Sequence, residues 1–216
     1  MPAPKASSIA PLVTWLMLQL GVLVLIAADV RISRNLPRPP NPTESIAAHT
    51  MLVVQLLASA MLFPWLLRTW TSTAIVIAAT WPMLQFTGLL SAVQPSPLLV
   101  ATLYISLWLL AMRLWHLALP TDHARLIASA GATLLVLLGP VLSYLHLAYD
   151  VGPQGPPWNL LPLLGPLPGA LEMLSGSKWG LQWWIVGTAL LLPLALVLLT
   201  RLSRQFFHTS STAAHP

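Results

Sequence analysis

The chain contains no cysteine among its 216 residues, and only 7% of its residues are charged. The missing thiols exclude disulfide bonds, thiolate metal sites, cysteine-ligated iron–sulfur clusters and cysteine nucleophiles. The charged fraction lies far below the roughly 25% of an ordinary soluble domain. With 56% hydrophobic residues and a mean hydropathy of +0.77, the chain carries more apolar surface than a water-soluble fold buries. The sequence therefore predicts an integral membrane protein.

Several catalytic motifs are missing as well. The sequence has no helical zinc-protease motif, no glycine-flanked serine elbow and no glycine-rich phosphate-binding loop. We therefore expect no catalytic activity of its own, no metal site and no resident cofactor. The formal charge is +5, but the ten basic residues lie singly or in small groups at the ends of apolar runs. This placement indicates topology and headgroup anchors, not a nucleic-acid surface.

The apolar residues come in runs of about 20, which is the length a helix needs to cross a hydrocarbon core of about 30 Å. The sequence predicts an all-α, polytopic bundle of about six transmembrane helices within residues 11–200, with a short tail at 1–10 and a disordered tail at 201–216. The basic start before the first run also fits a secretory signal, and we expect an uncleaved helix instead. The expected spans are 11–28, 46–67, 72–93, 98–117, 124–149 and 179–199.

Residues 150–177 form the most unusual stretch of the sequence. Six prolines and five glycines interrupt an otherwise apolar segment between the fifth and sixth spans. Such a segment is too broken to span the membrane and too apolar to be a free loop. Irregular backbone at membrane depth is tolerated only where protein or a cavity satisfies it. We therefore predict a re-entrant or interfacial segment.

Prolines and small residues also interrupt the predicted spans. Each proline leaves one backbone carbonyl unpaired and kinks its helix. Small residues allow close contact between helices. The prolines are Pro64, Pro82, Pro140 and Pro193, and the small cluster in the fifth span is Ala128, Ser129, Gly131 and Ala132. Three polar residues inside spans, Gln19, Gln55 and Gln85, are expected to form interhelical hydrogen bonds.

The distribution of positive charge predicts the orientation. One side of a six-span bundle carries Lys5, Arg68, Arg113, Arg125, Arg201 and Arg204. The other side carries Arg31, Arg34, Arg38 and Lys178. Because positive residues concentrate in cytoplasmic loops, we expect both termini in the cytoplasm and a location in a bacterial inner membrane.

Two histidines lie at similar depth near one surface of the predicted bundle. His49 is about one turn into the second span, and His146 is about one turn from the end of the fifth. Such a pair suits haem ligation, metal ligation or a proton relay. Interfacial histidines that make ordinary hydrogen bonds give the same pattern, so both interpretations stay open.

The predicted topology has six spans, both termini in the cytoplasm, and a Pro/Gly-broken segment at 158–176, followed by a tryptophan-led last helix that ends in arginines. With these features it resembles the permease subunits of ABC-type exporters of the second, six-helix class. The resemblance implies a re-entrant hairpin at 158–176 and a separate ATPase partner. The loop between the second and third spans is nearly absent, so the implied docking surface is the 113–125 connection. Its residues are Arg113, His116, Asp122 and Arg125.

The leading hypothesis is a permease-like membrane subunit that works in the lipid bilayer with other protein subunits. The first alternative is a membrane anchor subunit of a redox complex that binds haem or quinone through His49 and His146. The second is a purely structural accessory subunit.

Overall fold

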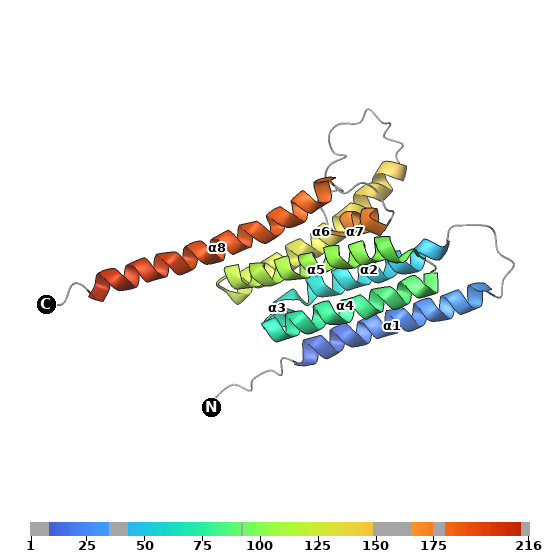
Figure 1. Ribbon diagram of the computed structural model, residues 1–216, viewed down its shortest axis with the longest axis horizontal. Coiled ribbons are helices and arrows are strands. Elements are labelled where there is room, and N and C mark those ends of the chain that lie inside the picture. Colours follow the sequence, from blue (N-terminus) through green and yellow to red (C-terminus); the bar gives the residue numbers. More distant parts are fainter. Residues whose placement is uncertain (1–8, 35–42, 92, 149–165, 175–179, 213–216) are drawn as a thin grey trace.

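The computed structural model describes residues 9–34, 43–91, 93–148, 166–174 and 180–212, and every regular element in these ranges is a helix (Figure 1). The all-α prediction is therefore confirmed for the described residues. The helices are α1 (Ile9–Arg34), α2 (Thr43–Met61), α3 (Phe63–Leu66), α4 (Trp70–Ser91), α5 (Pro95–Ala118), α6 (Asp122–Ala148), α7 (Pro166–Leu174) and α8 (Gly180–Thr212).

Among the described residues, four helices are long and apolar enough to cross a membrane, and the chain is a multi-pass helical membrane protein. They lie over the predicted spans 11–28, 72–93, 98–117 and 179–199, and six spans are not confirmed. The predicted span 46–67 divides into α2 and α3, and its apolar helix, Ala47–Met61, is shorter than the other four. The four spanning stretches are Ile9–Ala28, Trp70–Leu90, Pro95–Ala118 and Trp183–Thr200.

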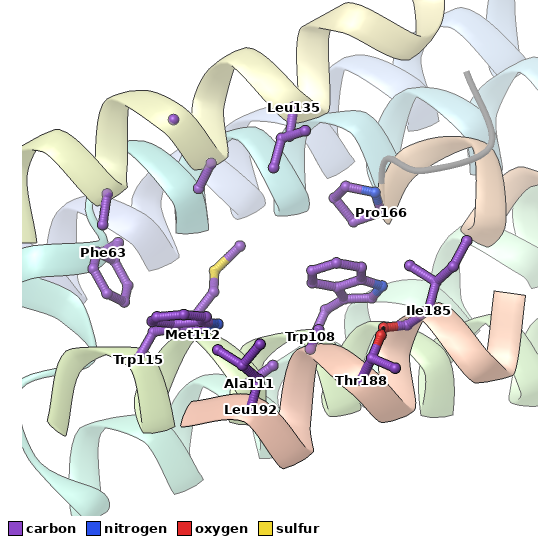
Figure 2. Close-up of a pocket in the computed structure, with 14 residues that line it drawn as sticks. Phe63, Trp108, Ala111, Met112, Trp115, Leu135, Pro166, Ile185, Thr188 and Leu192 are labelled. Atoms are coloured by element: carbon purple, nitrogen blue, oxygen red, sulfur yellow. Dashed lines mark hydrogen bonds between the residues drawn. The ribbon is translucent and has the colours of Figure 1, made fainter. Parts of the chain in front are cut away.

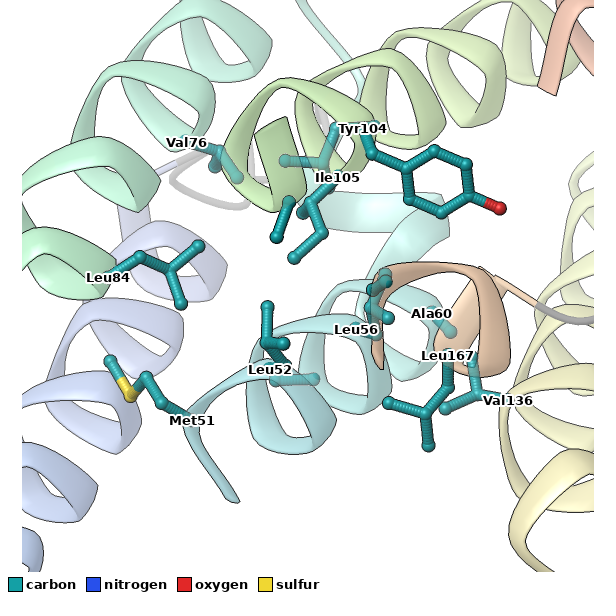
Figure 3. Close-up of a cluster of buried hydrophobic side chains, with 14 of the residues drawn as sticks. Met51, Leu52, Leu56, Ala60, Val76, Leu84, Tyr104, Ile105, Val136 and Leu167 are labelled. Carbon is teal, nitrogen blue, oxygen red and sulfur yellow. The ribbon is translucent and has the colours of Figure 1, made fainter. Parts of the chain in front are cut away.

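The interior of the bundle forms around α2 and α5. Helix α2 packs against α1, α4 and α6, and α5 packs against α4, α7 and α8. Leu52 and Leu56 of α2 face Ile105 of α5 in the buried cluster shown in Figure 3. Lipid chains are as apolar as these side chains, so van der Waals packing and interhelical hydrogen bonds hold such helices together.

The short helix α7 lies inside the bundle. It is the described part of the segment predicted to be re-entrant; residues 150–165 and 175–177 lie outside the described residues. Helix α7 packs against α2, α5 and α6. Its Leu167 is 1% exposed and lies beside Leu56 and Ala60 of α2 and Val136 of α6 (Figure 3). Val136 lies in the middle of α6, whereas Ala60 is the next-to-last residue of α2, so Leu167 packs beside the C-terminal part of α2.

The last helix has a single main neighbour. Helix α8 packs against α5, where the rings of Trp183 and Tyr104 meet edge to face with centroids 5.9 Å apart. Further along the helix, six leucines are exposed: Leu191, Leu192, Leu194, Leu196, Leu198 and Leu199. The helix continues to Thr212, through most of the predicted disordered tail, because no proline or glycine interrupts residues 201–212.

One end of the bundle collects several features that the sequence assigns to one side of the membrane. Figure 1 shows the start of α1, helix α3, the turn between α5 and α6, and the end of α8 at the same end. This agrees with the grouping used for the charge count. Which side of the membrane it faces stays a prediction.

Candidate functional site

Several buried polar side chains meet at the break between α2 and α3. Pro64 has no N–H, so it cannot donate to the carbonyl of Ala60 as a helical residue would. The amide of Trp65 donates to Leu62 O at 3.1 Å, a tighter turn that leaves the carbonyl of Met61 free as well. The helix interruption expected at Pro64 is therefore present, and it exposes two carbonyls within an apolar bundle.

The hydroxyl of Ser129 of α6 shares its one proton between both carbonyls. Its Oγ lies 2.7 Å from Ala60 O and 3.2 Å from Met61 O, and the residue is 7% exposed. The small cluster around Ser129 lets α6 approach α2 closely enough for these contacts. Sequence reasoning assigned Ser129 to packing and missed its hydrogen bonds. A proline in one span and a hydroxyl within a small-residue cluster of another were the available signals.

Arg113 of α5 binds the end of α3. Its Nη1 donates to Leu67 O and Arg68 O, both at 2.8 Å, and its guanidinium carbon lies 5.1 Å from the ring centroid of Trp70. The carbonyl end of a helix favours a positive charge, and an aromatic face favours it too. Arg113 is only 5% exposed, so this charge is held by dipoles and a ring within the protein.

His116 of α5 contacts both α3 and Arg113. Its Nε2 lies 3.3 Å from Pro64 O, and its Nδ1 lies 3.4 Å from Nη1 of Arg113. A carbonyl accepts and a guanidinium donates, so the network assigns the neutral tautomer with the proton on Nε2. The ring also packs edge to face against Phe63. We call Arg113, His116 and Ser129 the polar clasp, because together they hold the carbonyls of residues 60–68.

The four residues predicted to dock a partner separate into two groups. Arg113 and His116 are buried in the polar clasp. Asp122 has a 92% exposed side chain and forms an ion pair with Arg125, whose side chain is 24% exposed, at 2.7 Å. The exposed part of the predicted surface is therefore the first turn of α6, and the buried part connects it to α3.

An apolar cavity of about 490 Å³ lies next to the polar clasp, between α5, α6 and α8. Phe63, which packs against His116, stands at one end, and Pro166 of α7 stands at the other (Figure 2). The volume falls within the roughly 300–1,000 Å³ of small-molecule sites. The remaining lining residues are Trp108, Ala111, Met112, Trp115, Ala128, Gly131, Ala132, Leu135, Ile185, Thr188, Ala189 and Leu192.

The two histidines proposed as haem ligands lie on packed helices. Helices α2 and α6 run antiparallel, and the contact of Ser129 with Ala60 marks one end of the pair. His49 and His146 lie toward the other end. The side chain of His146 is outside the described residues, so haem ligation stays a prediction. Within the described ranges no group of three or more histidine or carboxylate side chains is arranged to hold a metal.

Two buried glutamines lie between α1 and α2. Trp15 Nε1 donates to Ser59 Oγ at 3.1 Å. Gln19 follows Trp15 by one turn and Gln55 precedes Ser59 by one turn, so in this antiparallel pair the two amides lie at the same level. They are 0% and 1% exposed, and none of their amide atoms has a hydrogen-bond partner among the described residues. The interhelical hydrogen bonds expected of this glutamine pair are therefore not present there.

No protein-family model, curated protein or solved structure matches the chain significantly. The likeness to exporter permeases therefore stays a resemblance of topology.

Proposed function

We propose that the chain is a permease-like membrane subunit that works with partner chains, including a separate ATPase, in a bacterial inner membrane with both termini in the cytoplasm. The observation that carries the proposal is the position of α7. A short helix within residues 158–176, buried among α2, α5 and α6, supports the re-entrant hairpin that the resemblance implies there. The shared end of α1, α3 and α8 supports the proposed arrangement of the termini (Figure 1).

The polar clasp supplies a route by which a partner would act on this bundle. A partner that binds Asp122 contacts the first turn of α6, two turns before Ser129. A shift of α6 moves Ser129 relative to the carbonyls at the α2–α3 break. Arg113 and His116 act as positioning residues in this scheme, because they hold α3 and are not exposed to the partner.

Purification from native membranes in mild detergent, followed by mass spectrometry, tests the proposal. We expect a nucleotide-binding subunit to be recovered with the chain. Asp122→Arg should reduce that recovery, because it reverses the charge of the exposed residue in the first turn of α6. Gln94→Arg is the matched control, since Gln94 is exposed at the opposite end of α5.

Recovery of the chain without an ATPase, or with a yield that Asp122→Arg does not change, would count against the proposal. An absorbance spectrum of the same sample tests the redox alternative. A Soret band that His49→Ala or His146→Ala abolishes would replace the permease with a haem-binding anchor.

A further inference from the structure

The cavity beside the polar clasp is lined mainly by apolar side chains. None of its lining residues is charged. The hydroxyl of Thr188 donates to the carbonyl of Ile185 in its own helix at 2.8 Å, so it is already partnered, whereas the buried Nε1 of Trp108 has no hydrogen-bond partner among the described residues. The cavity extends at least from Ala128 to Leu135 along α6, about 10 Å at 1.5 Å per residue. That length covers much of one leaflet of a hydrocarbon core about 30 Å thick.

The cavity is open toward the bilayer. Leu135 of α6 and Leu192 of α8 line it and are 43% and 52% exposed. Helix α8 packs against α5, and α6 packs against α2, α3 and α7, so the opening lies between α6 and α8 with α5 behind it (Figure 2). In a membrane this opening faces lipid chains.

One basic side chain, that of Arg125, lies near one end of the cavity. Arg125 precedes the lining residue Ala128 by one turn, on the same face of α6. Its partner, Asp122, is almost fully exposed, and exposed ion pairs contribute little to stability, so another anion replaces it at small cost. Residues 61–125 contain three arginines and one acidic residue. Charge complementarity therefore favours an anionic headgroup at this end.

We propose that the groove between α6 and α8 binds an anionic phospholipid, with one acyl chain in the cavity and the phosphate beside Arg125. The long apolar wall selects a lipid chain, and the arginine selects the negative headgroup. This inference does not rest on the permease proposal, because a bound lipid would accompany the chain in any assembly.

The test uses the purified full chain in mild detergent, with phosphatidylglycerol and phosphatidylcholine of identical acyl chains as probes. Native mass spectrometry counts the bound lipids, and titration gives each affinity. We expect one retained phosphatidylglycerol, bound more tightly than phosphatidylcholine. Arg125→Gln should lower the affinity for phosphatidylglycerol about fivefold, which is the effect of one basic side chain near an anionic headgroup. It should leave the affinity for phosphatidylcholine unchanged.

Gly131→Leu tests the acyl-chain position. A Cβ at Gly131 would meet nothing within 4 Å, so the leucine side chain enters the cavity without a clash near the backbone. It should abolish retention of both lipids. Gly21→Leu is the matched control, because Gly21 is equally open but lies on α1. Leu192→Trp fills the cavity from α8 and gives a second variant if Gly131→Leu does not fold.

Equal affinity of the two lipids, or undiminished retention in both cavity-filling variants, would overturn the proposal. A transmembrane polypeptide that cross-links to position 131 while no lipid is retained would also overturn it, and would assign the groove to a partner helix.

Discussion

The polar clasp and the glutamine pair are two polar regions buried in the same apolar bundle, and they differ in how their polar atoms are satisfied. At the clasp, Arg113, His116 and Ser129 contact five backbone carbonyls of residues 60–68, and Arg113 Nε alone has no partner among the described residues. At the glutamine pair, the amide atoms of Gln19 and Gln55 have no partner among the described residues. The clasp therefore stabilises the packing of α5 and α6 against the α2–α3 break, whereas burial of the unpartnered glutamine amides is expected to lower the free energy of unfolding.

The difference indicates distinct roles. An unsatisfied polar group in hydrocarbon costs several kcal/mol in principle, so a polar side chain inside a bundle is either a structural joint or a residue kept for another purpose. We therefore expect substitutions at the clasp to lower stability and substitutions of the glutamines to raise it. Free energies of unfolding in detergent can be followed by tryptophan fluorescence, since the chain has ten tryptophans and no cysteine for thiol dyes.

Arg113→Met should have the largest effect. It leaves Leu67 O and Arg68 O without their donor at the end of α3, and we expect a loss of about 3 kcal/mol in the free energy of unfolding. Arg68→Met is the control, because Arg68 is exposed. A loss no greater than that of Arg68→Met would show that the guanidinium does not hold this end of α3.

Ser129→Ala should cost about 1 kcal/mol, the usual range for an interhelical hydrogen bond in a membrane protein. Ser106→Ala is the matched control. Ser106 is equally buried, but its Oγ donates to Thr102 O within the same helix at 2.8 Å. If both variants lower the free energy of unfolding equally, the contact between Ser129 and the α2–α3 break stabilises the protein no more than a hydrogen bond within one helix.

Gln19→Met and Gln55→Met should each raise the free energy of unfolding by about 1 kcal/mol, because an apolar side chain of similar length replaces an unpartnered amide. Gln94→Met, at an exposed position, should change it little. The opposite pattern, in which each single variant is less stable and the double variant regains stability, would show that the two amides bond to each other.

His116→Phe should have the smallest effect. Phenylalanine keeps the ring beside Phe63 but loses contacts that are already long, 3.3 and 3.4 Å. We expect a loss of about 0.5 kcal/mol, the low end for a hydrogen bond. A loss as large as that of Arg113→Met would instead make His116 the main support of Arg113.

The sequence predicted the positions of the helices better than the contacts between them. Runs of apolar residues located the spans at 11–28, 72–93, 98–117 and 179–199, since length and hydropathy are properties of one segment. The break at Pro64 was also predictable, because it follows from the missing N–H. The partners of the freed carbonyls were not, because they depend on which helices pack together.

The same limit explains the placement of Arg113 and His116. Both lie next to a polar turn in the sequence, and this position favoured an exposed docking surface. In the structure, the end of α5 turns them toward α3, where backbone carbonyls replace solvent. A helix that is apolar on all sides gives no periodic signal for its buried face. The cavity between α6 and α8 was not predictable for the same reason.

The polar clasp also sets an order of events during synthesis. Its three side chains follow the carbonyls that they bind by 45 to 69 residues. At about 5–20 residues per second, a ribosome needs several seconds to add that much chain. Throughout that interval the carbonyls at the Pro64 break must bond to water, to lipid headgroups or to the insertion machinery. The polar clasp is therefore complete only after Ser129 of α6 has been synthesised.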